Sequence, residues 1–406
     1  MSATSIRQLP KEFWHFVSAK LSFTLGIRMV TTIVIYQVFH LSNTFTVGMA
    51  GLAEFVPAVI TAIYAGHYID THDKRSILLS SYTLYALCAI FLAVVSSSWF
   101  SFSNDSLIKF ILGTVFLTGV IRSFSGPAAN AMIAAIVPRD QLQTAITFNS
   151  SAYLIASVTG HATGGLLIAL VGISSSYFVA ASLIVLSLSF GYFIKPKPPT
   201  PVTIKESKIK SIQGGFKYVW NNKTLLSVIS LDLFAVFFGG AVAFIPEIAE
   251  TVLHAGPMGY GFLNAAMDLG ALCSVGLLIA MPMRRKQGMK MMLAIAGFGI
   301  CIIAFGLSKV YWLSFASLAI AGFLDGVSVV VRGTITQLQT PDELRGRVSS
   351  INMIFINSSN ELGQFESGIT SRLFGTVNAI VIGGAMSILI VAGTWVGFPK
   401  LKKLEY

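Results

Sequence analysis

The chain has 406 residues, of which 54% are hydrophobic and only 11% are charged, whereas soluble domains carry roughly a quarter charged residues. Its net charge is +11, but the Lys and Arg residues form no basic face with interleaved aromatic residues, so we expect no nucleic-acid partner. The composition excludes a water-soluble globular domain and predicts an all-α, polytopic membrane protein.

Apolar runs long enough to cross a bilayer, about 20 residues each, recur along the whole chain. The first run contains Lys20 and Arg28 and is followed by no small-residue cleavage site, so we expect a first span rather than a removable signal peptide. In chain order the runs predict twelve transmembrane helices, at residues 13–38, 45–69, 76–98, 107–135, 142–171, 174–194, 224–253, 258–281, 288–308, 311–337, 347–371 and 375–398.

A segment rich in Pro and Lys, KPKPPTPVTIKESKIK, separates the sixth and seventh predicted spans. This composition suits an exposed linker rather than a packed helix. The chain is therefore expected to contain an N-terminal six-helix bundle (1–194), a cytoplasmic linker (195–223) and a C-terminal six-helix bundle (224–406). The end of the linker, IQGGFKYVWNNK, mixes polar and apolar residues, and we expect it to lie along the inner leaflet.

An internal repeat supports the division into two halves. An offset of 203 residues superposes Gly160 on Gly363 and Gly165 on Gly368, and it places Asp325 at the position of Arg122. Duplicated halves are typical of transporters whose substrate site lies near the bilayer midplane. The repeat therefore predicts two pseudo-symmetric bundles.

The basic residues lie mainly in alternate loops. With the N-terminus in the cytoplasm, the inner segments hold 21 Lys and Arg residues and the outer segments hold three. This imbalance predicts that both termini are cytoplasmic.

Three sequence patterns resemble the major facilitator superfamily. Gly66 and Asp70, followed by Lys74 and Arg75, resemble its loop motif, with departures at Tyr68 and Asp73. Arg122, four residues before Gly126, resembles its arginine-glycine motif. The segments FLDGVSVVVRGTITQLQTPDELRGRVSS and SNELGQFESG resemble the branch of enterobactin-exporter-like efflux proteins. The resemblance covers nearly the whole chain and implies an alternating-access transporter.

The loop motif also has a physical interpretation. Asp70 at the inner end of the second span can accept hydrogen bonds from a helix N-terminus, and we expect that of the eleventh span. Lys74 and Arg75 are expected to bind cytoplasmic partners or lipid head groups. The alternative is that both residues act only as topology signals.

Charged residues inside the predicted spans are candidate functional groups, because each costs about 3 kcal/mol or more at the bilayer centre. The family places the first, fourth, seventh and tenth helices around a cavity, which implies that Arg28, Arg122 and Asp325 approach it. We select Glu54 and Asp325 as proton-coupling candidates, since a carboxylate beside an arginine can exchange a proton for substrate. The alternative for each is a structural pair, and for Asp232 and Glu366 it is hydration near the surface. The candidate cavity and coupling residues are Arg28, Glu54, Arg122, Asp325, Arg332 and Glu361.

The fifth span contains Gly160, His161, Gly164 and Gly165, a pattern that resembles the exporter motif Gly-Pro-x-x-Gly-Gly with His in place of Pro. The glycines permit close helix packing. His161 could titrate near neutral pH and contribute to coupling. The alternative is a buried histidine with satisfied hydrogen bonds.

The favoured function is proton-coupled export of a siderophore, drug or similar amphipathic molecule across a bacterial inner membrane. Proton-coupled uptake of a molecule such as an iron-siderophore complex and a non-transporting receptor are the alternatives. The sequence contains no HExxH, GxSxG or GxxxxGK motif and no metal-spaced His/Cys cluster, so we expect neither an enzyme nor a metal site. The expected partners are a small-molecule substrate, protons and the lipid bilayer. We expect a monomer with no cofactor, driven by the proton gradient.

Overall fold

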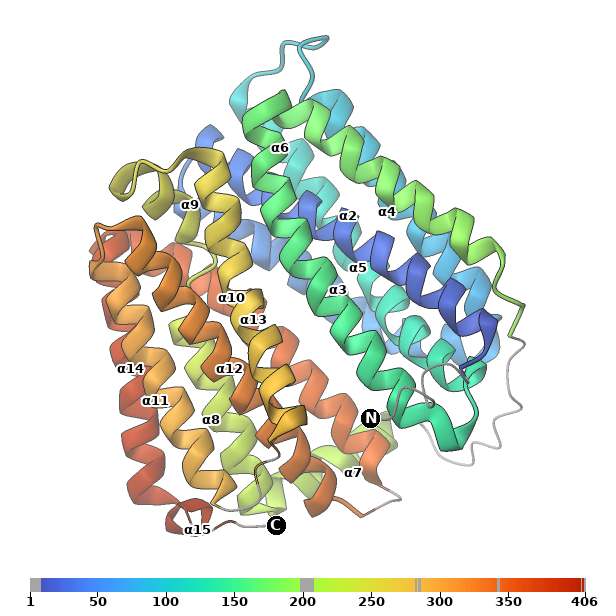
Figure 1. The fold of residues 1–406 in the computed structure, drawn as a ribbon, viewed down its shortest axis with the longest axis vertical. Coiled ribbons are helices and arrows are strands. Elements are labelled where there is room, and N and C mark those ends of the chain that lie inside the picture. The colour runs from blue at the N-terminus through green and yellow to red at the C-terminus, as the bar shows by residue number, and fades with distance from the viewer. Residues whose placement is uncertain are drawn as a thin grey trace. The chain divides into compact units, whose positions relative to one another are not determined.

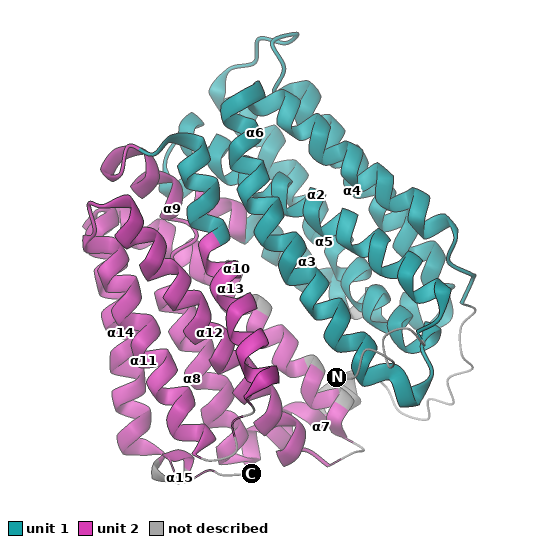
Figure 2. Ribbon diagram, in the orientation of Figure 1, with its two compact units in different colours: residues 1–46, 52–202, 255–265 teal, residues 47–51, 203–254, 266–406 magenta. Residues whose placement is uncertain are grey.

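The computed structural model of the chain describes residues 9–197, 208–281, 283, 286–341, 344–402 and 404. Part of the predicted linker, residues 198–207, lies outside these ranges. The chain divides into two compact units, shown in different colours in Figure 2. Unit 1 comprises residues 1–46, 52–202 and 255–265, and unit 2 comprises residues 47–51, 203–254 and 266–406.

The described residues form helices and connecting loops, with no strand among them. The N-terminal half contains five long helices and one short 3-10 helix, labelled in Figure 1: α2 (Lys11–Leu41), α3 (Thr44–Thr71), α4 (Lys74–Val95), α5 (Asn104–Ile136), η1 (Arg139–Gln141) and α6 (Leu142–Tyr192). The C-terminal half contains α7 (Lys208–Asn221), α8 (Lys223–Gly239), α9 (Ile245–Glu247), the π-helix η2 (Ile248–Val252), α10 (Gly256–Ala280), α11 (Gln287–Leu307), α12 (Tyr311–Gln339), α13 (Arg345–Phe374), α14 (Thr376–Gly397) and α15 (Pro399–Lys402).

Short polar side chains begin several helices. Asn43 accepts a hydrogen bond from the Thr46 backbone N–H at 3.1 Å at the start of α3. Ser103 has the same role at α5, and Asn222 accepts from two N–H groups at α8. The first N–H groups of a helix have no partner within the helix, so such side chains fix where it starts.

Helix α6 continues through two predicted spans. Gly172 is its one non-helical residue, with φ 81° and ψ 173°. A positive φ is accessible to glycine at little cost, so the chain kinks there, and α6 consists of two helices that meet at Gly172. The sequence-predicted boundary between 142–171 and 174–194 falls at this residue.

The single predicted span over 224–253 is wrong. Helix α8 ends at Gly239, and after a short irregular segment the chain forms α9 and η2. Gly239 and Gly240 together favour the break, because glycine loses the most conformational freedom in a helix. Pro246 then occupies the first turn of α9, where its missing N–H costs nothing.

In the described part of the chain, nine helices are long and apolar enough to cross a membrane, or ten when α7 and α8 are counted as one bent span. The two helices of α6 that meet at Gly172 count once in that number. The polar helix α13 is not among the nine, although the sequence predicts a span at 347–371.

Each unit has its own apolar core. In unit 1 the side chains of Phe13, Phe16, Tyr82 and Met132 are almost fully buried and belong to one cluster. In unit 2 the corresponding cluster includes Leu225 and Met291. Glycines bring helices together around these cores. In unit 1, α2 passes close to α6 at Gly26 and Gly164, as small residues permit in membrane helix pairs.

Candidate transport site

Glu54 of α3 and Arg122 of α5 form an ion pair in unit 1. Arg122 Nη1 donates to Glu54 Oε1 at 2.9 Å, and the two side chains remain 37% (Arg122) and 32% (Glu54) exposed. Gly119, one turn before Arg122, lets the two helices approach, since a Cβ there would lie 2.9 Å from Pro57 Cγ. The structure therefore joins two of the sequence-predicted site residues.

The surroundings of this pair are polar. Thr61 of α3 donates to the Ser123 hydroxyl of α5 at 2.8 Å, a second link between the same helices. Buried Tyr85 of α4 donates to the Thr118 carbonyl at 3.2 Å and lies close enough to interact electrostatically with both members of the pair. Polar side chains of three helices therefore lie around the pair.

Arg28 of α2 contacts Tyr153 of α6. Its guanidinium donates to the Tyr153 hydroxyl and lies 5.4 Å from the centre of that ring. Gly160 makes the contact possible, because a Cβ there would lie 2.7 Å from Arg28 Cβ. The combination of hydrogen bond and cation-π contact is a favourable setting for an arginine at membrane depth.

His161 is buried, with its Nδ1 atom 2.7 Å from the Thr32 hydroxyl oxygen. The Thr32 hydroxyl donates its proton to the Arg28 carbonyl at 2.9 Å. Gly164 packs against Thr32, and Gly165 packs against Gly261. The structure thus gives the histidine a hydrogen-bonded place at a tight helix contact.

A second ion pair lies in unit 2, between Asp232 of α8 and Arg332 of α12. Arg332 Nη1 donates to Asp232 Oδ2, and the Ser328 hydroxyl donates to Asp232 Oδ1 at 3.0 Å. The charged side chains are only 4% and 5% exposed. The sequence alternative that Asp232 is hydrated near the surface is therefore wrong. Burial forces this carboxylate to find a cationic partner on another helix.

Asp325 lies two turns before Arg332 on α12 and interacts electrostatically with Asp268 of α10. The two helices meet closely, because a Cβ at Gly322 would collide with the Met267 backbone and one at Gly270 with the Ala319 backbone. Asp268 is a site residue that sequence reasoning did not select.

Glu361 of α13 is buried, with 7% of its surface exposed, and belongs to neither ion pair.

The loop between α3 and α4 is joined to the end of α6. Asp73 accepts hydrogen bonds from the Ser76 backbone N–H at 2.9 Å and from the Lys197 backbone N–H. Arg75 donates to the Tyr192 carbonyl at 2.9 Å. Burial raises the pKa of Asp73, but the hydrogen bonds from Ser76 and Lys197 outweigh it and leave the pKa below its usual value. The predicted latch from Asp70 to the eleventh span would join the two units and stays a prediction.

The same region holds an ion pair that sequence reasoning did not select. Lys197 Nζ lies 2.9 Å from Glu12 Oε1 at the start of α2. The start of the linker is thereby attached to the first helix as well as to the loop motif. The sequence could have indicated that Asp73 caps α4, because an Asp directly before a helix commonly accepts a hydrogen bond from the N–H group three residues later, here that of Ser76.

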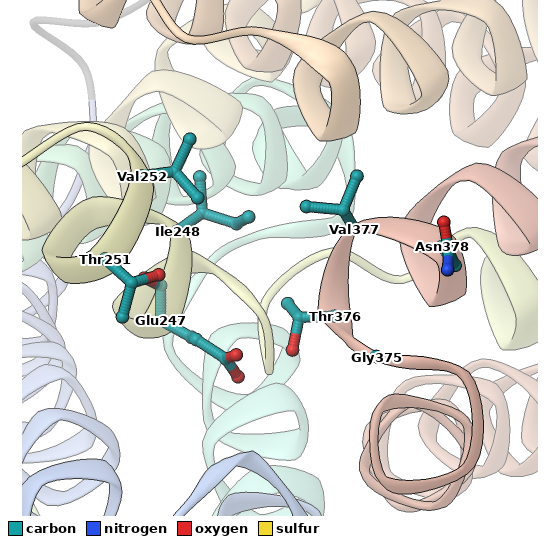
Figure 3. Close-up of a pocket in the computed structure, with 8 residues that line it drawn as sticks. All are labelled: Glu247, Ile248, Thr251, Val252, Gly375, Thr376, Val377 and Asn378. Carbon is teal, nitrogen blue, oxygen red and sulfur yellow. The ribbon is translucent and has the colours of Figure 1, made fainter.

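A separate pocket lies in unit 2 between α9–η2 and the α13–α14 turn (Figure 3). Its volume is about 280 Å³, and Glu247, Thr251, Thr376 and Asn378 supply its polar lining. None of the predicted site residues lines it. Its volume also falls below the range of about 300–1,000 Å³ that is usual for small-molecule sites, so we do not assign it to the substrate.

Long apolar helices with ion pairs between them are typical of a polytopic membrane protein. The chain belongs to the transmembrane secretion effector family of the major facilitator superfamily, whose profile matches residues 18–405. This confirms the resemblance seen in the motifs.

Relatives and solved structures agree with this family. The enterobactin exporter EntS of Shigella dysenteriae serotype 1 (strain Sd197) is 27% identical over 317 residues, which cover 76% of this chain and 73% of that protein. The D-xylose-proton symporter has a TM-score of 0.75 at 13% identity over 97% of this chain and 99% of that one. A POT family transporter crystallised with 5-aminolevulinic acid has a TM-score of 0.78 at 10% identity over 97% of each chain. Because its family and relatives are transporters, this chain is a transporter and not an enzyme, as its sequence predicted.

Proposed function

We propose that this chain is a proton-coupled secondary transporter that exports a siderophore, drug or similar amphipathic small molecule across a bacterial inner membrane. The observation that carries the proposal is the Glu54–Arg122 pair, a charged pair inside apolar helices that remains about one-third exposed. The similarity to enterobactin exporters supports the substrate class and the direction.

The geometry suggests how a proton and a substrate compete at this pair. The ionised Glu54 carboxylate can exchange its 2.9 Å contact with Arg122 for a cationic or hydrogen-bond-donating group of the substrate, which enters from the cytoplasm. Protonation of Glu54 from the outer side then removes the negative charge that holds this group, and the substrate is released there. Loss of the proton to the cytoplasm restores the ion pair with Arg122, so the proton enters as the substrate leaves. Asp325, beside Asp268, is the second proposed proton site.

We also infer the topology from sequence and structure together. Division of α6 at Gly172 and inclusion of α13 as a polar span support twelve transmembrane helices in two pseudo-symmetric bundles. The excess of Lys and Arg in alternate loops supports cytoplasmic termini. We propose that the monomer is the transporting form.

The test uses purified protein in liposomes under an imposed pH gradient, with a panel of siderophores and cationic drugs. We expect substrate-dependent proton flux with at least one compound and its loss in Asp325→Asn. Asp105→Asn is the matched control, because Asp105 is exposed in the first turn of α5 and should leave the flux unchanged. Substrate movement without proton flux would overturn the coupling, and flux only in the import direction would overturn export.

A further inference from the structure

Helix α7 turns sharply from the helix that follows it. The axis of residues 214–221 of α7 and the axis of α8 differ in direction by 96°, and the helices break at Asn222. The Asn222 side chain accepts from the N–H groups of Thr224 and Leu225 at 3.1 and 3.2 Å and so fixes the start of α8. If α8 crosses the bilayer, α7 runs parallel to the membrane surface at the end of unit 2 where α15 also lies (Figures 1 and 2).

One face of α7 is anchored to unit 2. A Cβ at Gly215 would lie 2.9 Å from Ile351 Cδ1 of α13, and Val219 is only 2% exposed. The Tyr218 hydroxyl donates to the Gln339 carbonyl at the end of α12 at 2.6 Å. These contacts hold α7 against the ends of α12 and α13.

The other face combines aromatic and basic side chains. Phe216 is 47% exposed and Trp220 is 62% exposed, and their rings stack with centroids 5.8 Å apart. Lys217 and Lys223 are exposed in the same region. Aromatic rings are favoured at the membrane interface, and basic residues there are attracted to anionic head groups.

We propose that this face of α7, formed by Phe216, Lys217 and Trp220, together with Lys223 at the start of α8, binds anionic phospholipid head groups of the cytoplasmic leaflet. The rings enter the boundary between head groups and acyl chains while the ammonium groups contact phosphates. Lipid is favoured over a protein partner because the helix lies at right angles to α8 and carries rings and lysines together. Since α7 is joined to α8 and packed on α13, lipid charge acts on the helices of unit 2. The proposal needs neither proton coupling nor a particular substrate.

The test measures which lipid surrounds Trp220. The full chain is reconstituted in phosphatidylcholine vesicles that contain either brominated phosphatidylglycerol or brominated phosphatidylcholine at the same mole fraction. The quenching at Trp220 is obtained as the loss of fluorescence in the native protein minus the loss of fluorescence in the Trp220→Phe variant. Trp312 is the matched control. It is 73% exposed in the first turn of α12, three residues after Lys309, and its quenching is obtained in the same way with the Trp312→Phe variant.

We expect brominated phosphatidylglycerol to quench Trp220 more strongly than brominated phosphatidylcholine, with a smaller difference at Trp312. In titrations of the phosphatidylglycerol fraction, Lys217→Gln and Lys223→Gln should each weaken the apparent affinity about fivefold. The Lys217→Arg and Lys223→Arg variants should retain it, and high salt should weaken it. Equal quenching by the two lipids would overturn the anionic preference. Absence of quenching at Trp220 would show that another protein surface covers α7.

Discussion

In the described part of each unit, an acidic and a basic residue of different helices form an ion pair, Glu54–Arg122 in unit 1 and Asp232–Arg332 in unit 2, and these two pairs differ in exposure. In unit 1, the side chains of Glu54 and Arg122 are about one-third exposed. In unit 2, Asp232 and Arg332 are 5% and 4% exposed, and Ser328 adds a hydrogen bond to the same carboxylate. A carboxylate–arginine pair is therefore accessible in unit 1, and a pair of the same kind is closed off in unit 2.

This difference suggests different tasks. A partly exposed pair loses less than a fully buried one when it breaks, so it can break and reform at lower cost. A buried pair that loses one partner leaves an uncompensated charge and destabilises the fold strongly. We therefore assign the accessible pair to transport and the closed pair to the stability of unit 2.

The largest predicted effect follows from removal of one member of the closed pair. Asp232→Leu leaves the Arg332 charge buried, and we expect a loss of about 3–5 kcal/mol in the free energy of unfolding. Thermal unfolding of the purified protein in detergent measures it. The double variant Asp232→Leu/Arg332→Leu should recover most of the loss, because apolar residues of similar volume suit a buried site. A single variant as stable as the native protein would remove the structural role of the pair.

A smaller effect is predicted where α3 and α5 meet beside the accessible pair. A Cβ at Gly119 would lie 2.9 Å from Pro57 Cγ and 3.0 Å from the Glu54 carbonyl carbon, so Gly119→Ala forces the helices apart. We expect a destabilisation of about 1–3 kcal/mol. Gly113→Ala is the control on the same helix, because a Cβ there has no neighbour within 4 Å. Equal unfolding temperatures for the two variants would contradict the close approach.

The smallest predicted effect concerns the loop between α3 and α4 and depends on pH. The pKa of Asp73 is lowered, so its stabilising contribution is present above the unfolded value of about 4 and is lost as pH falls through the lower folded value. Asp73→Ala should cost about 1 kcal/mol at neutral pH, as loss of a helix cap does. The difference from the native protein in thermal unfolding should shrink in acid. A difference that is constant with pH would argue against a cap formed by the ionised carboxylate.

The sequence predicted the membrane class and most helix positions, because apolar length is a strong local signal. It could not predict which charges pair. Asp325 and Arg332 share one face of α12, but the spacing within a helix says nothing about the partner on another helix. Arg332 contacts Asp232 of α8, which lies 100 residues earlier in the chain, and Asp325 interacts electrostatically with Asp268 of α10. The break after Gly239 was missed because the apolar run continues across it.

The assignment of the two pairs is tested most directly by proton flux in liposomes for Glu54→Gln and for Asp232→Leu/Arg332→Leu, each normalised to folded protein and supplied with a transported substrate. We predict that Glu54→Gln unfolds at nearly the native temperature but loses substrate-dependent proton flux, while the double variant retains it. Unchanged flux in Glu54→Gln, together with its loss in the double variant, would contradict the assignment and place the coupling in unit 2.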